Sequence, residues 1–124
     1  MVGGSAGSHL ISSLKTLCVM RGVRLPDELY LFYPSLTLDL DVFTPSLLLC
    51  LDDLMLKQPE VKFYGAAYNR KNANPKNPLL SPYYTPDYIL AKYPKTVILA
   101  CEIDPLRDVS YILAMRLKKL GVET

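Results

Sequence analysis

The stretch Gly3-Gly4-Ser5-Ala6-Gly7-Ser8-His9-Leu10 decides the fold. Three glycines among the first seven residues predict a sharp, strained turn, because glycine tolerates backbone angles that other residues avoid. Apolar residues then recur at helical spacing, which predicts an amphipathic helix directly after the turn: Leu10, Ile11, Leu14, Leu17 and Cys18. Gly22 is expected to end that helix.

Two short apolar runs outside this stretch predict buried strands. They are Leu29-Tyr30-Leu31-Phe32-Tyr33 and Thr96-Val97-Ile98-Leu99-Ala100-Cys101. Both are apolar on their two faces, as in the strands of a parallel sheet covered on both sides. Only Met1 and Val2 precede Gly3, so the strand before the turn is expected to be a stub. Strands alternating with helices predict an α/β fold with about three parallel strands, flanked by helices on both faces.

The remaining helices are expected at three places. Pro45 begins a helix through Met55, Pro59 begins a short helix that includes Tyr68, and Asp108 caps a final helix ending at Gly121. We expect residues 69–78 to form a polar surface loop and residues 81–94 to form an irregular segment. The apolar stretches 47–55 and 63–68, like Tyr83, Tyr84 and Tyr88, belong more often to a core than to a lipid pocket.

Length and composition exclude several classes of protein. The 124 residues suffice for one domain, and half of them are hydrophobic, so a core can form. A net charge of +2 argues against a nucleic-acid partner. Neither a membrane-spanning run nor a signal peptide is expected. The spacing of the three cysteines fits no metal site and indicates reduced, buried thiols of a cytoplasmic protein: Cys18, Cys50 and Cys101.

Residues 3–7 fit the Gly-x-Ser-x-Gly pattern of a nucleophile elbow. In that motif the serine lies on a tight turn between strand and helix, with its hydroxyl exposed. Gly3 and Gly7 would let the two backbones approach without Cβ clashes. Ala6 would offer its backbone N–H to an oxyanion, assisted by the helix dipole. The pattern alone equally fits an ordinary Gly-Ser turn, whereas a phosphate-binding loop is disfavoured because no lysine follows the last glycine.

Asp104 is the candidate acid, because it follows the second strand at the carboxyl end where parallel sheets place their sites. Alternatively, an aspartate before a proline simply starts a turn. Ser5 before Asp104 matches the chain order Ser, Asp, His. The only histidine, His9, lies one helical turn after Ser5. It is therefore expected to pack or to form a supporting hydrogen bond rather than to act as the base.

These residues and several further segments resemble hormone-sensitive lipase and its relatives among the α/β-hydrolases. The resemblance covers nearly the whole chain. It is carried by residues 3–10, by Gly22-Val23-Arg24-Leu25-Pro26-Asp27, Tyr33-Pro34, Asn77-Pro78-Leu79-Leu80-Ser81-Pro82, Cys101-Glu102-Ile103-Asp104-Pro105-Leu106-Arg107-Asp108, and by Arg116-Leu117 through Gly121-Val122.

The resemblance implies a serine carboxylic ester hydrolase that acts on an ester or lipid substrate in lipid catabolism, without a cofactor or metal. By position, Ser5 is the nucleophile, Asp104 orients the histidine, and Ala6 contributes an oxyanion N–H. Residues 1–124 correspond to the central-to-C-terminal part of one catalytic domain, without its N-terminal strands and last strand. Contact with a lipid surface is implied by the family alone.

Three departures from the family pattern bear on activity. Gly4 replaces an aspartate, which is expected to loosen the elbow, and Ser8 and His9 replace glycine and asparagine. The family's upstream His-Gly-Gly motif and its downstream catalytic histidine have no counterparts here. The chain alone is therefore expected to be inactive and to associate through open sheet edges. The alternatives are a non-catalytic binding protein on a hydrolase scaffold, as in the gibberellin receptors, and an inactive truncated product.

Overall fold

The computed structural model describes residues 1–39, 41–52, 55–69 and 73–124. Three strands, β1 (Val2–Gly4), β2 (Glu28–Phe32) and β3 (Lys95–Leu99), form a parallel sheet in the order β1-β2-β3. Val2 pairs with Tyr30, and Tyr30 pairs with Val97. The predicted three-stranded parallel sheet with flanking helices is confirmed.

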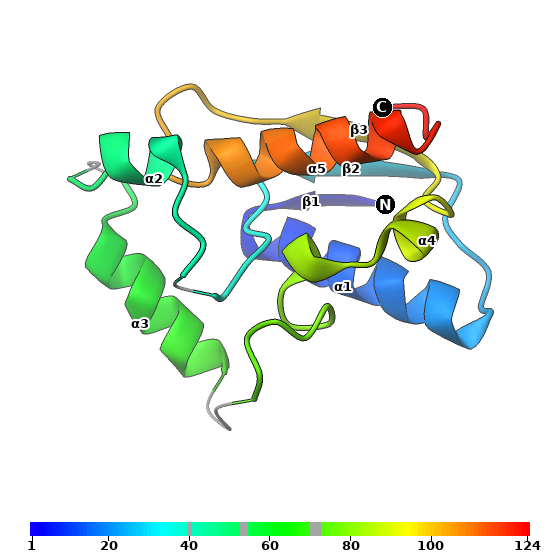
Figure 1. Cartoon of the computed structure of the whole chain (residues 1–124), viewed down its shortest axis with the longest axis horizontal. Helices are drawn as coiled ribbons and strands as arrows, with labels where there is room; N and C mark the ends of the chain where they lie inside the picture. Colours follow the sequence, from blue (N-terminus) through cyan, green and yellow to red (C-terminus); the bar gives the residue numbers. More distant parts are fainter. Residues whose placement is uncertain (40, 53–54, 70–72) are drawn as a thin grey trace.

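The helices connect and cover these strands (Figure 1). They are α1 (Ala6–Arg21), α2 (Pro45–Leu49), α3 (Gln58–Tyr68), the 3₁₀ turn η1 (Pro82–Tyr84), α4 (Asp87–Leu90) and α5 (Arg107–Lys119). α1 ends as predicted, because Gly22 takes a left-handed conformation and its N–H bonds back to the last turn. No helix within the described ranges is long and apolar enough to cross a membrane.

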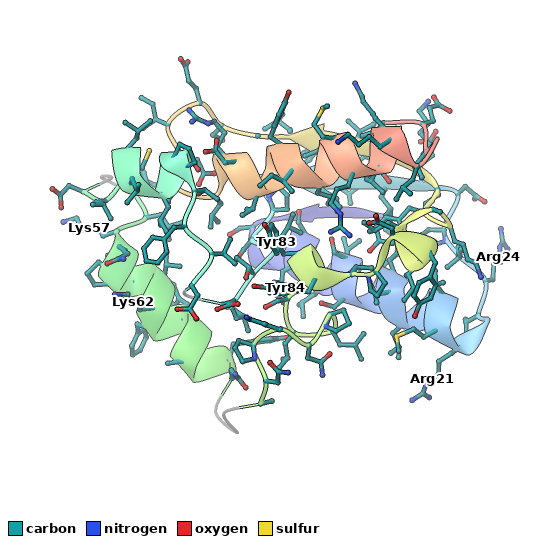
Figure 2. The ribbon with its side chains drawn as sticks, viewed as in Figure 1. Arg21, Arg24, Lys57, Lys62, Tyr83 and Tyr84 are labelled. Carbon is teal, nitrogen blue, oxygen red and sulfur yellow. The ribbon has the colours of Figure 1, made fainter. Side chains whose placement is uncertain are left out.

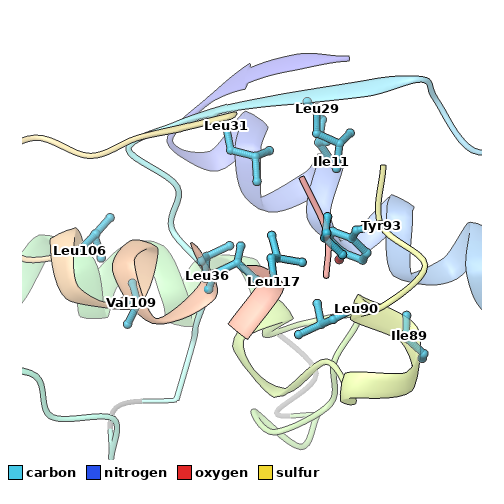
Figure 3. Close-up of a cluster of buried hydrophobic side chains, with 12 residues drawn as sticks. Ile11, Leu29, Leu31, Leu36, Ile89, Leu90, Tyr93, Leu106, Val109 and Leu117 are labelled. Carbon is cyan, nitrogen blue, oxygen red and sulfur yellow. The ribbon is translucent and has the colours of Figure 1, made fainter. Parts of the chain in front are cut away.

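The core lies on one face of the sheet. Leu29 and Leu31 of β2 point into one cluster with Ile11 of α1 and Leu117 of α5 (Figure 3). The cluster as a whole contains Ile11, Leu29, Leu31, Leu36, Ile89, Leu90, Tyr93, Leu106, Val109, Leu113, Leu117 and Val122. Both long helices therefore pack on the same face.

The opposite face of the sheet is exposed, so the expectation of helices on both faces is wrong. The side chains of Val2, Val97 and Leu99 are 65%, 38% and 49% exposed. The sequence predicts burial on both faces of these strands because the residues on the exposed face are as apolar as those on the core face. The expected open edge at β3 is also wrong at one position, since Thr96 N–H donates to Glu123 O at 2.9 Å.

Three details of the helices differ from the sequence prediction. α2 begins at Pro45, with Thr44 as its cap, but ends at Leu49; Leu54 of the predicted helix lies outside the described residues. α5 begins at Arg107, one residue before the predicted cap. Asp108 is not that cap, because its carboxylate accepts hydrogen bonds from Ser46 N–H and Arg107 Nε.

α3 forms where predicted but contributes no buried residue. Phe63 and Tyr64 are mostly exposed, which contradicts their prediction as core residues. The three tyrosines predicted as core residues have different environments. Tyr83 packs against the core cluster, Tyr84 donates a hydrogen bond to the Asp39 carboxylate, and Tyr88 is exposed. All three cysteines are free, but only Cys50 is buried, so the prediction of three buried thiols is wrong.

Candidate active site

Ser5 occupies a strained turn between β1 and α1. Its backbone angles are φ 49° and ψ −116°, which a residue with a side chain rarely adopts. The turn is held because Ser5 N–H donates to Phe32 O at 2.9 Å, at the end of the neighbouring strand. Ser5 is exposed. This is the strand–turn–helix context that the sequence motif requires.

The steric role predicted for the glycines holds at one position and fails at the other. A Cβ at Gly3 would lie 2.6 Å from Ile11 Cδ1 and 2.7 Å from the Gly7 carbonyl carbon, so only glycine lets β1 approach α1 this closely. A Cβ at Gly7 would meet nothing within 4 Å among the described residues. The clash argument for Gly7 is therefore wrong.

Ser8 anchors the turn, and no sequence motif indicated this role beyond the departure of Ser8 from the family pattern. Its hydroxyl is fully buried and donates to Gly3 O at 2.5 Å, while Phe32 N–H donates to it at 3.1 Å. One side chain on the first turns of α1 thus bonds to β1 and β2 together. The expected loosening of the elbow is countered by this bond.

Tyr33 fills the space beside Gly4. It has a left-handed backbone (φ 37°) directly after β2, and its N–H donates to Leu99 O at 2.6 Å. A Cβ at Gly4 would lie 3.1 Å from the Tyr33 hydroxyl. The aspartate that the resemblance noted above implies at this position would therefore press against this ring.

Asp104 lies five residues beyond the end of β3 and therefore follows the same carboxyl end of the parallel sheet as Ser5. Its Oδ1 accepts from Leu106 N–H at 2.8 Å, and its carbonyl accepts from Arg107 N–H at 3.1 Å. One strand separates β1 from β3, so the strand ends preceding these residues are about 10 Å apart. An imidazole between Ser5 and Asp104 would be needed to connect them.

His9 is not between them. Its Nδ1 lies 2.7 Å from Ser35 O, its ring packs edge-on against Tyr68 at 5.5 Å, and it is buried. Nδ1 therefore carries the proton, and no atom of the described residues meets hydrogen-bond geometry at the buried Nε2. Burial lowers the pKa of His9 despite nearby carbonyls of Ser35 and Leu80. The expectation that His9 packs and forms a supporting hydrogen bond is confirmed.

Ala6, the residue predicted to donate to an oxyanion, lies at the N-terminus of α1. Ala6 is the first residue of this 16-residue helix and is exposed next to Ser5. The first N–H groups of a helix have no partner within it and carry its positive dipole end.

Within the described ranges, no three His, Cys, Asp or Glu side chains gather as metal ligands would.

Known proteins resemble the chain in sequence over part or all of its length. A family described by the alpha/beta hydrolase fold matches residues 1–124. Human hormone-sensitive lipase is 48% identical over 46 residues, which are 37% of this chain and 4% of the human protein. The mouse protein is 44% identical over 46 residues, 37% of this chain and 6% of its own length.

Solved esterase structures match almost the whole chain. Carboxyl esterase 2 from Tuber melanosporum superposes with a TM-score of 0.92 and 30% identity, covering 98% of this chain and 39% of the esterase. Brefeldin A esterase, a bacterial homologue of human hormone-sensitive lipase, superposes with a TM-score of 0.87 and 25% identity, covering 98% of this chain and 36% of the esterase. The chain thus spans less than two fifths of each of these two solved chains.

Proposed function

The chain belongs to the α/β-hydrolase family, and from this we propose that it carries the nucleophile and acid of a serine carboxylic ester hydrolase. Ser5 attacks the ester carbonyl, Ala6 N–H binds the developing oxyanion, and Asp104 orients a histidine that takes the serine proton. The observation that supports this most is the strained conformation of Ser5 at the N-terminus of α1.

The isolated chain is expected to hydrolyse esters poorly, because His9 bonds elsewhere and no other histidine is present. Loss of one triad member typically lowers kcat by about four to six powers of ten. Incubation with a short-chain nitrophenyl ester should therefore give no turnover above that of Ser5→Ala. Clear Ser5-dependent turnover would show that the chain supplies its own base.

The function is tested by placing the chain within a complete hydrolase domain. Residues 1–124 replace the matching segment of the Tuber melanosporum esterase, whose remaining part supplies the rest of the domain. We expect the chimaera to hydrolyse nitrophenyl butyrate, and Ser5→Ala to lower kcat by about 10⁶. Asp104→Asn should lower it by about 10⁴. A folded chimaera without activity would favour the non-catalytic binding protein.

A lipid substrate is supported by the exposed apolar side chains around α2 and α3. Leu49 and Phe63 are 77% and 68% exposed, and Lys57 and Lys62 lie at the same end of the molecule (Figure 2). We propose that this surface contacts ester-bearing lipid. Phe63→Lys should weaken co-flotation with triacylglycerol emulsions, whereas Tyr111→Lys on α5 should not. Equal flotation of both variants would contradict the contact.

Cytoplasmic localisation remains our proposal, supported by three free thiols. Alkylation with a maleimide in intact cells tests it. We expect Cys101, the exposed thiol, to be modified without prior reduction.

A further inference from the structure

The segment that carries Asp104 is exposed before that residue and buried directly after it. It follows an edge strand, and Cys101, Glu102 and Ile103 are exposed. Its local bonds include those from Leu106 N–H to Asp104 Oδ1, from Arg107 N–H to Asp104 O at 3.1 Å and from Arg107 Nη1 to Glu102 O at 3.0 Å. Leu106, two residues after Asp104, packs in the core cluster. The exposed part of such a loop opens locally unless another element fixes the loop beside it.

That element is α2, through Ser46. The Ser46 hydroxyl donates to Pro105 O at 3.0 Å and accepts from Asp108 N–H at 3.2 Å. Pro105 is the residue directly after Asp104. Ser46 is fully buried, so these bonds are made away from water.

A further hydrogen bond joins Ser46 and Asp108, with Ser46 as the donor. Ser46 N–H donates to Asp108 Oδ2 at 2.8 Å, and the other carboxylate oxygen accepts from Arg107 Nε at 3.0 Å. Burial disfavours the charged form of Asp108, but the bonds from Ser46 and Arg107 outweigh it and lower the pKa of the carboxyl. Ser46 and Asp108, 62 residues apart in sequence, thus exchange backbone and side-chain hydrogen bonds.

Capping alone does not account for Ser46. The cap of α2 is Thr44, whose hydroxyl accepts from Leu47 N–H at 3.3 Å. The Ser46 hydroxyl has one proton and two lone pairs, and the bonds to Pro105 and Asp108 use the proton and one lone pair. The second lone pair faces the Thr44 hydroxyl at 3.2 Å. Two of the three bonds of the Ser46 hydroxyl therefore go to Pro105 in the loop and to Asp108 at the start of α5, and not to its own helix.

We propose that Ser46 and Asp108 are positioning residues that fix Asp104 at the carboxyl end of β3. The catalytic meaning of this position rests on the proposed function, in which Asp104 orients the histidine. The pair sets where the carboxylate lies and does not touch the substrate.

The test follows Asp104 itself in the 124-residue chain by nuclear magnetic resonance. The two signals are the Asp104 carboxyl carbon and the Leu106 amide, which donates to that carboxylate. In Ser46→Ala we expect both resonances to move and exchange of the Leu106 amide to accelerate about tenfold. The Leu31 amide, in the central strand, should keep its exchange rate.

Ser12→Ala is the matched control. Ser12 is equally buried, and its hydroxyl donates to Ser8 O at 2.9 Å on α1, far from the loop in sequence. It should leave the Asp104 and Leu106 signals unchanged. Unchanged signals in Ser46→Ala, or equal changes in both variants, would overturn the proposal.

Asp108 provides the second variant. Asp108→Ala should reproduce the effect of Ser46→Ala, and the double variant should add little, because both remove the same connection. Asp108→Asn keeps an oxygen for Ser46 N–H and should be close to the wild type. If Ser46→Ala does not fold, the Asp104 carboxyl and Leu106 amide signals of Asp108→Ala test the proposal instead. Neither signal depends on turnover, so an inactive chimaera would leave this result standing.

Discussion

Single hydrogen-bonding side chains decide how well the elbow is held. Ser8 bonds to Gly3 and Phe32, whereas the nearby hydroxyl of Ser13 is buried without a partner in the described part of the chain. The two serines lie on the same helix and differ in whether their hydroxyls are bonded.

Ser8→Ala should therefore lower the free energy of unfolding by about 1–3 kcal/mol, because it leaves Phe32 N–H without its partner. Ser13→Ala should be neutral or slightly stabilising, since it removes an unpaired polar group. Urea unfolding of both variants measures the difference. Equal effects would mean that Ser8 does not hold the turn.

His9 predicts a pH dependence of stability. Its pKa in the folded chain lies below the ordinary 6.5, so the unfolded chain binds its proton more readily. The resulting contribution to stability is complete above pH 6.5 and is lost as the pH falls from there towards the lower folded value.

We expect the unfolding free energy of the wild type to decrease between pH 7.5 and about 5.5 and that of His9→Asn to decrease less. Asparagine keeps a donor for Ser35 O but does not titrate in this range. If the unfolding free energies of the wild type and His9→Asn changed in parallel with pH, His9 would not be the source of the pH dependence.

The sequence identified Ser5 and Asp104 as candidates because short motifs surround them. It gave no signal for Ser46, whose bonds join positions 62 residues apart. The same holds for Tyr33, whose ring fills the space at Gly4. Interactions of this kind depend on how distant segments meet.

At the scale of elements, α5 is joined to the segment before β3 by Arg116. Its guanidinium donates to Tyr83 O at 2.7 Å and Thr85 O at 2.6 Å and pairs with Asp87 at 2.5 Å. A planar fork of donors reaches all three acceptors, which a single ammonium cannot do.

Arg116→Lys should therefore cost about 1–3 kcal/mol of stability although it keeps the charge. Arg21→Lys, at the exposed end of α1, is the control and should change stability by less than about 0.5 kcal/mol. Thermal unfolding of both variants gives the comparison. A loss of stability in Arg21→Lys as large as that in Arg116→Lys would contradict the proposed role of the Arg116 guanidinium.

Element positions were predicted well where helical or apolar periodicity was clear, as in α1, β2, β3 and α5. Boundaries shifted where tertiary bonds compete, as at Asp108, which serves Ser46 instead of a cap. α3 shows the limit of periodicity, because the apolar spacing that predicted burial says nothing about whether a partner covers the helix.

For the whole molecule, the exposed apolar face of the sheet predicts association. Parallel sheets normally have both faces covered, and uncovered strands tend to pair with other chains. Sedimentation velocity should show species larger than a monomer at micromolar concentration.

Val97→Lys should shift this equilibrium towards the monomer, because a charge on the exposed face opposes stacking. Tyr111→Lys, which places the same charge on α5, should not. A wild-type chain that stays monomeric, with a sharp thermal transition, would contradict the prediction. The one-sided core could not be foreseen, since the strands are apolar on both faces.

The central claim is that Ser5 is a nucleophile, and covalent trapping tests it most directly. The chimaera is treated with a fluorophosphonate, and the modified residue is located by mass spectrometry of its peptides. We predict one adduct within this segment, on Ser5, absent from Ser5→Ala and formed much more slowly in Asp104→Asn. An adduct on Ser8, or ester hydrolysis that persists in Ser5→Ala without any adduct in residues 1–124, would contradict the claim.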